Sequence, residues 1–226
     1  MSPRVACVIP ALNAAPTLGA VITGLRASIA NSVIVVVDDG SADGTREIAS
    51  RIADAHASFP TNRGKGAALR TGFAMALDLD ADVVVTIDAD GQHDPRLAPA
   101  LVQALGGADL AIGARDRRSA VMPPGRRLTN RMSAAAVAHV IGRPVDDAQS
   151  GFRAIARPLI EAVQPRGDRY EFETEFLILA AQRGYRVTFV PISTVYTTTV
   201  PSHFRPLRDS ARIVSTLWRF GVGGHR

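Results

Sequence analysis

Val83-Val84-Val85-Thr86-Ile87-Asp88-Ala89-Asp90 joins an apolar, largely β-branched run directly to a pair of carboxylates. A short run of this kind is typical of a strand that is buried on both faces of a parallel sheet. Similar runs occur at residues 5–9, 33–37 and 110–113. We therefore predict a strand at each of these positions, with the two carboxylates at the end of one of them.

Helical patterns lie between these runs. Apolar residues recur at helical spacing over residues 16–30, at Leu18, Val21, Ile22, Leu25 and Ile29. We predict a second helix that begins after Ser41 or Asp43, either of which can cap it, a third over residues 64–79, and a fourth that runs from Asp94-Pro95 to residue 105. The alternation predicts an α/β fold: an open, mostly parallel twisted sheet flanked by helices.

The second half of the sequence is less regular. A basic loop is predicted over residues 115–127, followed by helices over 131–141, 173–183 and 207–220. The chain length of 226 residues suits one large domain, which we place at residues 1–200, and a C-terminal amphipathic helical appendage at residues 201–226. Apolar residues and arginines are mixed in the appendage. It suits either a helix on an anionic membrane surface or a helix packed on the domain.

Composition narrows the setting of the protein. The N-terminus lacks the pattern of a signal peptide, and no stretch reaches the roughly 18 to 20 apolar residues of a membrane span. We therefore expect a cytoplasmic protein, with peripheral contact to the inner face of the membrane left open. A net charge of +5 fits nucleic acid, anionic lipid or phosphorylated small molecules as partners. No aromatic platform or nucleic-acid motif supports the first of these, so we expect no nucleic-acid partner.

Polar clusters follow the predicted strands, at the ends where open α/β sheets bind ligands. Asp88, Asp90 and Gln92 are spaced two residues apart and offer the hard oxygen ligands that suit Mg²⁺ or Mn²⁺. The same short pattern also fits a turn in which one aspartate caps the backbone. Asp38 and Asp39 likewise fit a turn completed by a glycine, or a pair of acceptors for a nucleobase N–H or a ribose hydroxyl.

The loop Asn62-Arg63-Gly64-Lys65-Gly66 suggests an anion site. It departs from the Walker pattern, and Leu69 stands where a dinucleotide fingerprint has its third glycine. Lys65 is the single lysine among 26 basic residues. We expect the helix that begins here to offer its N-terminal amides and Lys65 to an anionic ligand.

The order of these motifs resembles the family-2 glycosyltransferases of the GT-A fold. The motifs that carry the resemblance are Val8-Ile9-Pro10-Ala11-Leu12-Asn13, Val37-Asp38-Asp39-Gly40-Ser41, Asn62-Arg63-Gly64-Lys65-Gly66 and Asp88-Ala89-Asp90-Gly91-Gln92. Others resemble the dolichyl- and polyprenyl-phosphate branch, dolichyl-phosphate mannose synthase included: Gly113-Ala114-Arg115, Arg126 with Asn130-Arg131, Asp147-Ala148-Gln149-Ser150-Gly151-Phe152-Arg153, and Tyr170-Glu171-Phe172-Glu173-Thr174-Glu175. Ala14 departs from the acidic residue that the family often has after the asparagine of the first motif, which puts one donor contact in doubt.

The resemblance implies a set of site residues. Donor contacts are expected at Pro10, Ala11, Asp38, Asp39, Lys65, Asp88 and Ala89, with the base near Pro10 and Asp39. It implies a divalent metal on Asp88, Asp90 and Gln92 and phosphate contacts from Arg115, Arg126 and Arg131. Asp147 and Gln149 would lie near the reacting sugar and the acceptor, and we count Asp90 and the three arginines with them as catalytic.

The implied activity is an inverting transfer of a sugar, mannose or glucose, from a GDP- or UDP-sugar to a polyprenyl phosphate. A lipid phosphate is already anionic and needs no strong general base. An alternative is transfer to a hydroxyl of a soluble or protein-bound acceptor, for which Asp147 would serve as the base. A further alternative from another class is a non-catalytic adaptor that binds a nucleotide sugar without turnover.

Overall fold

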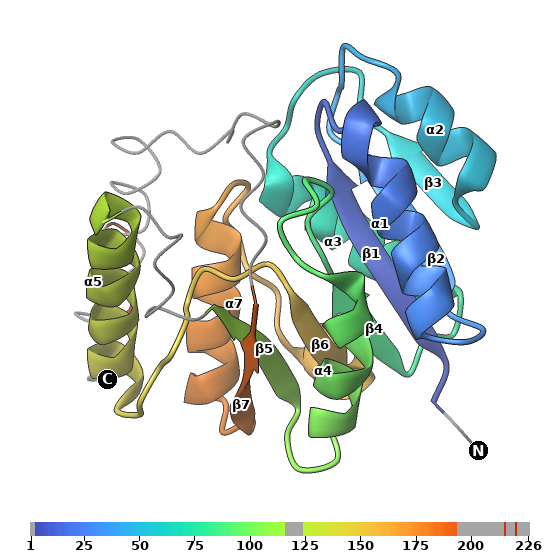
Figure 1. The fold of residues 1–226 in the computed structure, drawn as a ribbon. Helices are drawn as coiled ribbons and strands as arrows, with labels where there is room; N and C mark the ends of the chain where they lie inside the picture. Colours follow the sequence, from blue (N-terminus) through green and yellow to red (C-terminus); the bar gives the residue numbers. More distant parts are fainter. Residues whose placement is uncertain (1–2, 116–123, 194–214, 216–219, 221–226) are drawn as a thin grey trace.

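The computed structural model describes residues 3–115 and 124–193 together with Ser215 and Phe220, except for the side chains of residues 124–129. Its seven strands form one sheet with the order β3-β2-β1-β4-β6-β5-β7 (Figure 1). The strands are β1 (Val5–Ala11), β2 (Val33–Asp38), β3 (Ala55–Ser58), β4 (Val83–Thr86), β5 (Leu110–Arg115), β6 (Arg153–Ala156) and β7 (Val187–Ile192). The helices are α1 (Ala15–Ser28), α2 (Thr45–Ile52), α3 (Lys65–Asp78), the short 3₁₀ helix η1 (Pro95–Leu97), α4 (Ala98–Ala104), α5 (Pro124–Ile141), α6 (Arg157–Ala162) and α7 (Glu171–Gln182).

The sheet is parallel except at one strand. β1 pairs in parallel with both β2 and β4, β2 pairs in parallel with β3, and β5 pairs in parallel with β7. β6 lies antiparallel between β4 and β5. The chain crosses from one side of β1 to the other, so β1 separates β2 from β4 at the edge where parallel sheets bind ligands. The predicted mostly parallel α/β sheet is confirmed.

Helices cover both faces of the sheet (Figure 1), and the two largest apolar clusters lie on opposite faces. Alternate residues of β1 point to opposite faces: Val8 belongs to the core under α3 and α7, and Cys7 and Ile9 belong to the core under α1 and α4. A strand that is buried on both faces needs apolar residues at every position. This requirement explains the continuous runs from which β1, β2 and β4 were predicted.

Helix boundaries follow the expected chemistry with one correction. The Asp94 side chain accepts the Arg96 amide at the start of η1, as the cap predicts. At α2, however, Gly44 occupies the N-cap position. Asp43 lies one residue before Gly44, and its Oδ1 accepts the Thr45 amide at 3.0 Å.

Three strands, a short helix and part of another helix depart from the sequence-based expectations. β3, β6, β7 and α6 were not predicted. α5 begins at Pro124, inside the segment expected to be a loop, because proline is well tolerated in the first turn of a helix. The helix predicted at residues 207–220 lies outside the described residues except for Ser215 and Phe220. Within the described part of the chain, no helix has the length and apolar character needed to cross a bilayer.

Candidate active site

The carboxyl ends of β1 and β2 bring four predicted donor-binding residues together. Pro10 and Ala11 end β1 and lie in register with Val37 and Asp38 of β2. The Asp39 amide donates to the Ala11 carbonyl at 2.8 Å, which continues the pairing one residue beyond β2. The two strand ends and the turn after β2 are therefore held together by backbone hydrogen bonds.

Both acids of that turn hold the backbone in place. Asp38 Oδ1 accepts the Ser41 amide at 3.1 Å. Asp39 accepts the amides of Arg63 and Gly64, at 2.7 Å and 2.9 Å for its shortest bonds, and so ties the end of β2 to the loop before α3. Burial raises the pKa of Asp39, against the effect of these amide donors. The turn interpretation is thus confirmed for the two acids, and their role toward a nucleotide stays a prediction.

A cation lies between two carboxylates where β4 ends. Lys65 Nζ is 2.5 Å from Asp88 Oδ1 and 2.6 Å from Glu173 Oε1. Lys65 opens α3 and Glu173 belongs to the first turn of α7, so three separate segments meet at this point. Sequence reasoning quoted Glu173 within a motif but gave it no role. The feature that could have drawn attention to Glu173 is a charged residue at a position of α7 that is buried in the fold.

Electrostatics keep this cluster charged. Burial raises the pKa of Asp88, but the attraction of Lys65 outweighs burial and the pKa lies below its ordinary value. Burial lowers the pKa of Lys65, but the charges of Asp88 and Glu173 raise it above its ordinary value. The first carboxylate of the Asp88-Ala89-Asp90 triplet is therefore an anion at neutral pH.

A glycine lets the next loop approach this cluster. A Cβ atom at Gly151 would lie 2.7 Å from Lys65 Nζ and 2.8 Å from an Asp88 carboxylate oxygen. The Thr86 hydroxyl donates to the Gly151 carbonyl at 2.7 Å and fixes the glycine beside the end of β4. Only a residue without a side chain fits here without displacing the ion pair, which gives Gly151 a role that its motif alone did not reveal.

Asp147 and Arg115 form a second ion pair. Arg115 Nε and Nη2 donate to the two carboxylate oxygens of Asp147 at 2.6 Å and 2.9 Å. The amides of Gln149 and Ser150 also donate to Asp147 Oδ1. Burial raises the pKa of Asp147, but the Arg115 charge outweighs it and the pKa lies below its ordinary value. Three predicted site residues, Arg115, Asp147 and Gln149, therefore meet in one bonded unit.

The predicted metal ligands lie in a tight turn. Asp90 Oδ1 accepts the Gln92 amide at 3.0 Å, so the turn alternative is also realised. The Thr17 hydroxyl donates to the Ala89 carbonyl at 2.6 Å and holds the turn against α1. Among the residues that the structure describes, no group of three or more His, Cys, Asp or Glu side chains is placed to hold a metal ion. Asp88 and Asp90 with the side-chain oxygen of Gln92 would make an all-oxygen donor set, which fits Mg²⁺ or Mn²⁺.

His93 is a buried residue of this loop that sequence reasoning did not single out. Its ring stacks at a tilt on Phe152, with 5.5 Å between centroids, and its Nδ1 atom has no hydrogen-bond partner among the residues that the structure describes. Burial lowers its pKa to about 4, so the imidazole is neutral at pH 7. His93 thus joins the turn after β4 to the segment that ends at Phe152.

The N-terminus of α3 is not the open anion site that was predicted. The Asp168 carbonyl accepts the amides of Gly66 and Ala67 at 2.7 Å and 3.2 Å. A Cβ atom at Gly64 would lie 2.3 Å from the same carbonyl, so the loop before α7 covers this turn closely. The two amides are occupied by the chain itself because the loop docks where a ligand was expected. A contact from Lys65 to the nucleotide-sugar donor stays a prediction.

The remaining predicted arginines lie on α5. Arg131 is exposed on this helix. Arg126 lies in the same helix, and its side chain is outside the described set. The phosphate contacts expected of both residues stay predictions.

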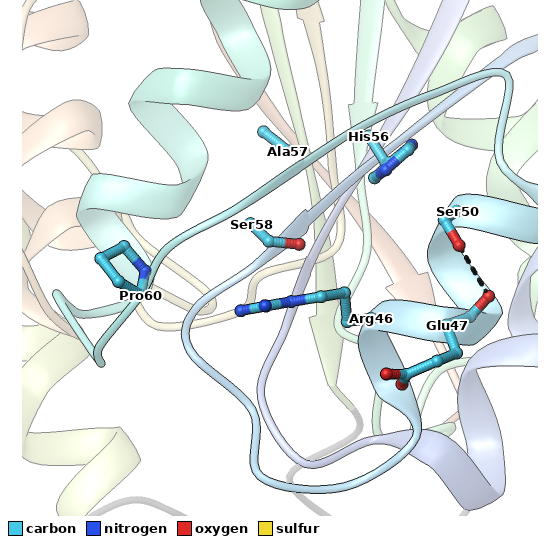
Figure 2. Close-up of a pocket in the computed structure, with 7 residues that line it drawn as sticks. All are labelled: Arg46, Glu47, Ser50, His56, Ala57, Ser58 and Pro60. Atoms are coloured by element: carbon cyan, nitrogen blue, oxygen red, sulfur yellow. Dashed lines mark hydrogen bonds between the residues drawn. The ribbon is translucent and has the colours of Figure 1, made fainter.

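A pocket of about 580 Å³ lies elsewhere, between α2 and the edge strand β3 (Figure 2). Its lining residues are Arg46, Glu47, Ser50, His56, Ala57, Ser58 and Pro60. None of them is a predicted site residue, and two strands separate β3 from β4. Arg46 connects the pocket with the end of β2, since its Nε atom is 3.5 Å from Asp38 Oδ2. The charged groups after β4 are not part of this pocket.

Comparisons with known proteins identify the family to which the chain belongs. A sequence model described as "Glycosyl transferase family 2" matches residues 6–164. The chain is 31% identical to an undecaprenyl-phosphate mannosyltransferase of Micrococcus luteus, over 85% of this chain and 81% of the relative. It is 33% identical to a polyprenol monophosphomannose synthase of Mycolicibacterium smegmatis, over 84% of this chain and 77% of the relative.

Solved structures show the same architecture. Glucosyl-3-phosphoglycerate synthase of Mycobacterium tuberculosis, in complex with Mn²⁺, uridine diphosphate and phosphoglyceric acid, superposes with a TM-score of 0.77 at 23% identity. The match covers 97% of this chain and 79% of that one, and it shows that the sheet and its helices form a GT-A fold. With the family match over most of its length, this chain belongs to glycosyl transferase family 2.

Proposed function

We propose that this protein transfers a hexose from a GDP- or UDP-sugar to a polyprenyl phosphate, with inversion at the anomeric carbon. Mannose is the first sugar to test, because the two relatives compared above are named as mannose-transferring enzymes of lipid phosphates. The proposed catalytic domain is residues 1–200, and the proposed membrane-associating appendage is residues 201–226. Peripheral contact with a membrane follows from such an acceptor, whose polyprenyl chain stays in the bilayer.

The observation that carries the acceptor class is the state of Asp147. Both of its carboxylate oxygens are engaged by Arg115, and the Arg115 charge keeps its pKa below the ordinary value. A carboxylate in this state is a weak base for an alcohol. A phosphate acceptor brings its own negative charge and needs no proton removed, so this geometry supports a lipid phosphate over a hydroxyl.

Asp88, Asp90 and Gln92 are the residues that would hold Mg²⁺ or Mn²⁺. When bound, the ion would neutralise charge on the diphosphate leaving group. The ionised state of Asp88, maintained by Lys65, suits a cation ligand. The hydrogen bond from the Gln92 amide to Asp90 fixes the turn that carries the other two proposed ligands.

The chain's own residues supply positioning and charge. In-line attack on the anomeric carbon requires that the protein hold donor and acceptor in a fixed relative orientation. Such positioning contributes much of the rate enhancement in reactions of this kind. The loop of residues 147–151 lies against Asp88 through Gly151 and against Arg115 through Asp147. We infer that the donor is bound on the Asp88 side of this loop and the acceptor phosphate on the Arg115 side. Arg115 would then lower the repulsion between the two phosphorylated substrates.

The alternative of a hydroxyl acceptor predicts a different product. A test supplies the protein with Mn²⁺ and radiolabelled GDP-mannose, UDP-glucose or UDP-N-acetylglucosamine, together with either a polyprenyl phosphate or the polyprenol of the same length. We expect label in the organic phase with the phosphate and not with the alcohol.

Three outcomes would count against the proposal. Equal labelling of phosphate and alcohol would support the hydroxyl acceptor. Label that enters the organic phase only with the alcohol would do the same. Tight nucleotide binding without transfer from any of these donors would support the adaptor.

A further inference from the structure

Arg153 is a buried arginine at the centre of the site that none of the steps above uses. It opens β6, in register with Thr86 of β4 and Ile112 of β5, and is 2% exposed. Buried arginines are rare unless their donors are satisfied. The contacts of this guanidinium therefore indicate what it is for.

Its three nitrogen atoms reach three different carbonyl groups. Nε donates to Ser150 at 2.8 Å and Nη2 donates to Ala148 at 3.1 Å, both in the loop that carries Asp147 and Gln149. Nη1 donates to the carbonyl of Glu173 on α7 at 2.8 Å. Arg153 thus joins the Asp147 loop to the helix that carries the partner of Lys65.

The two segments joined in this way hold opposite sides of the proposed reaction centre. The loop carries Asp147, which binds Arg115, and Gly151, which lies against Lys65 and Asp88. α7 carries Glu173, which lies 2.6 Å from Lys65 Nζ. A shift of the loop relative to α7 would change the distance between the Asp88 cluster and the Arg115–Asp147 pair.

We propose that Arg153 is a positioning residue that fixes this distance, and that it acts through the Asp147–Gly151 loop without touching either substrate. This role rests on the proposed function for the identity of the reaction. The fork geometry of the guanidinium is essential to it, because three fixed N–H directions serve three carbonyls at once. A lysine keeps the positive charge among Glu173, Asp147 and Asp88 but offers a single nitrogen.

The test compares Arg153→Lys with the intact protein. The matched control is Arg157→Lys, which changes an arginine four residues later that pairs with Glu161 at 2.8 Å on α6. The first measurement is amide hydrogen exchange. We expect exchange to accelerate roughly tenfold or more over residues 147–152 in Arg153→Lys and to stay unchanged over β1 and β2 and in the control.

The second measurement separates binding from turnover. In Arg153→Lys we expect kcat for sugar transfer to fall on the order of 10²-fold, because small misplacements of reacting groups cost about that much. The Kd for UDP or GDP with Mn²⁺ should change less than about twofold, because Arg153 contacts neither the β1 nor the β2 end. Arg157→Lys should keep both values.

Each outcome is decisive. Unchanged exchange over residues 147–152 in a folded Arg153→Lys protein would overturn the positioning role, as would a loss of nucleotide affinity equal to the loss of kcat. Global acceleration of exchange with a proportional loss of both constants would reduce Arg153 to a purely structural residue and overturn the proposal. If exchange rises locally while the intact protein transfers no sugar, the proposed function fails and the mechanical role of Arg153 stands.

Discussion

Asp90 stabilises a turn and is also a proposed metal ligand. Its Oδ1 atom accepts the Gln92 amide at 3.0 Å. In Asp90→Asn the side-chain carbonyl can still accept that amide while the negative charge is lost. The substitution therefore separates the fold of the turn from its charge.

We expect Asp90→Asn to weaken Mn²⁺ binding in the presence of UDP or GDP by roughly tenfold or more, because a hard cation depends on the charge of its ligands. The melting temperature should change little. Manganese electron paramagnetic resonance measures free Mn²⁺ directly and needs no turnover. Asp94→Asn is the matched control, since Asp94 belongs to the same loop but caps η1. Equal Mn²⁺ affinity in the two variants would remove the metal role from Asp90.

A substitution at Gly151 tests whether the close approach of the loop of residues 147–151 to the Lys65–Asp88 ion pair matters for activity. In Gly151→Ala the new methyl group would lie within 2.9 Å of Lys65 Nζ and of both Asp88 oxygens, so the loop or the ion pair must shift. We expect sugar transfer to fall about 100-fold, with a loss of unfolding free energy of about 1 to 3 kcal/mol. Gly107→Ala is the control, because a Cβ there meets nothing within 4 Å. Similar activities of the two variants, measured beside urea denaturation, would show that the close approach has no functional effect.

At the scale of elements, helix α3 begins under a loop rather than at open solvent. The Asp168 carbonyl caps its first amides, and Arg70 Nη1 donates to the Gly167 carbonyl at 2.7 Å. A Cβ at Gly66 would lie 2.4 Å from that Gly167 oxygen. The small residue therefore permits the docking of a loop, where its sequence pattern suggested the binding of a phosphate.

Gly66→Ala and Gly19→Ala should change stability in opposite directions. Alanine at Gly66 collides with backbone, and we expect it to lower the unfolding free energy by about 2 kcal/mol. Gly19 lies within α1, and a Cβ there meets nothing within 4 Å, so alanine should raise the unfolding free energy by about 0.5 to 1 kcal/mol. Urea denaturation of both variants checks the two signs. A stabilising Gly66→Ala would mean that the loop does not dock on α3 in solution.

Sequence patterns predicted the elements whose burial is uniform and missed those whose burial is mixed. β2 and β4 are covered on both faces and therefore consist of apolar runs. β3 is an edge strand of sequence Ala-His-Ala-Ser. In the sheet that the structure describes, it pairs only with β2 and is only partly buried, so it does not need the apolar, β-branched residues by which a strand is predicted. β6 begins with Arg153, and a charged residue argues against a buried strand. The strand is buried all the same because three backbone carbonyls accept hydrogen bonds from the guanidinium of Arg153.

The candidate site was predictable in the same uneven way. Strand-end residues such as Asp39 and Asp88 could be located because the carboxyl ends of parallel strands share one edge. Glu173 and Gly151 could not, since their roles depend on where α7 and the segment after Asp147 return to the sheet. Such contacts join positions far apart in the chain, and local patterns carry no information about them.

At the scale of the whole molecule, buried charges link stability to pH. Asp88 and Asp147 have pKa values below their ordinary range because the attraction of Lys65 and Arg115 outweighs burial. The folded state therefore gives up their protons more readily than the unfolded chain. Their stabilising contribution is present above the unfolded pKa, near 4 for an aspartate, and is lost as pH falls below that value.

His93 also makes the folded protein less stable as pH falls, but it does so at a higher pH than the two aspartates. Burial lowers its pKa from the ordinary 6.5 to about 4, so the unfolded chain takes up a proton between these values that the folded protein does not. Stability is therefore complete above about pH 6.5 and decreases as pH falls toward 4. At about 1.4 kcal/mol per pH unit, the loss from this residue amounts to about 3 kcal/mol.

Urea denaturation at several pH values between 7.5 and 4.5 measures this dependence. We expect the unfolding free energy of the intact protein to fall steadily below pH 6.5, and His93→Gln to flatten the curve in that range at some cost in stability at pH 7.5. His56→Gln is the matched control, because His56 lies exposed on β3 at the far edge of the sheet. A curve for His93→Gln as steep as that of the intact protein would show that other groups produce the dependence. It would also mean that the imidazole of His93 is not held neutral in the folded protein, because a buried neutral histidine releases its proton on folding and so makes the folded state less stable as pH falls.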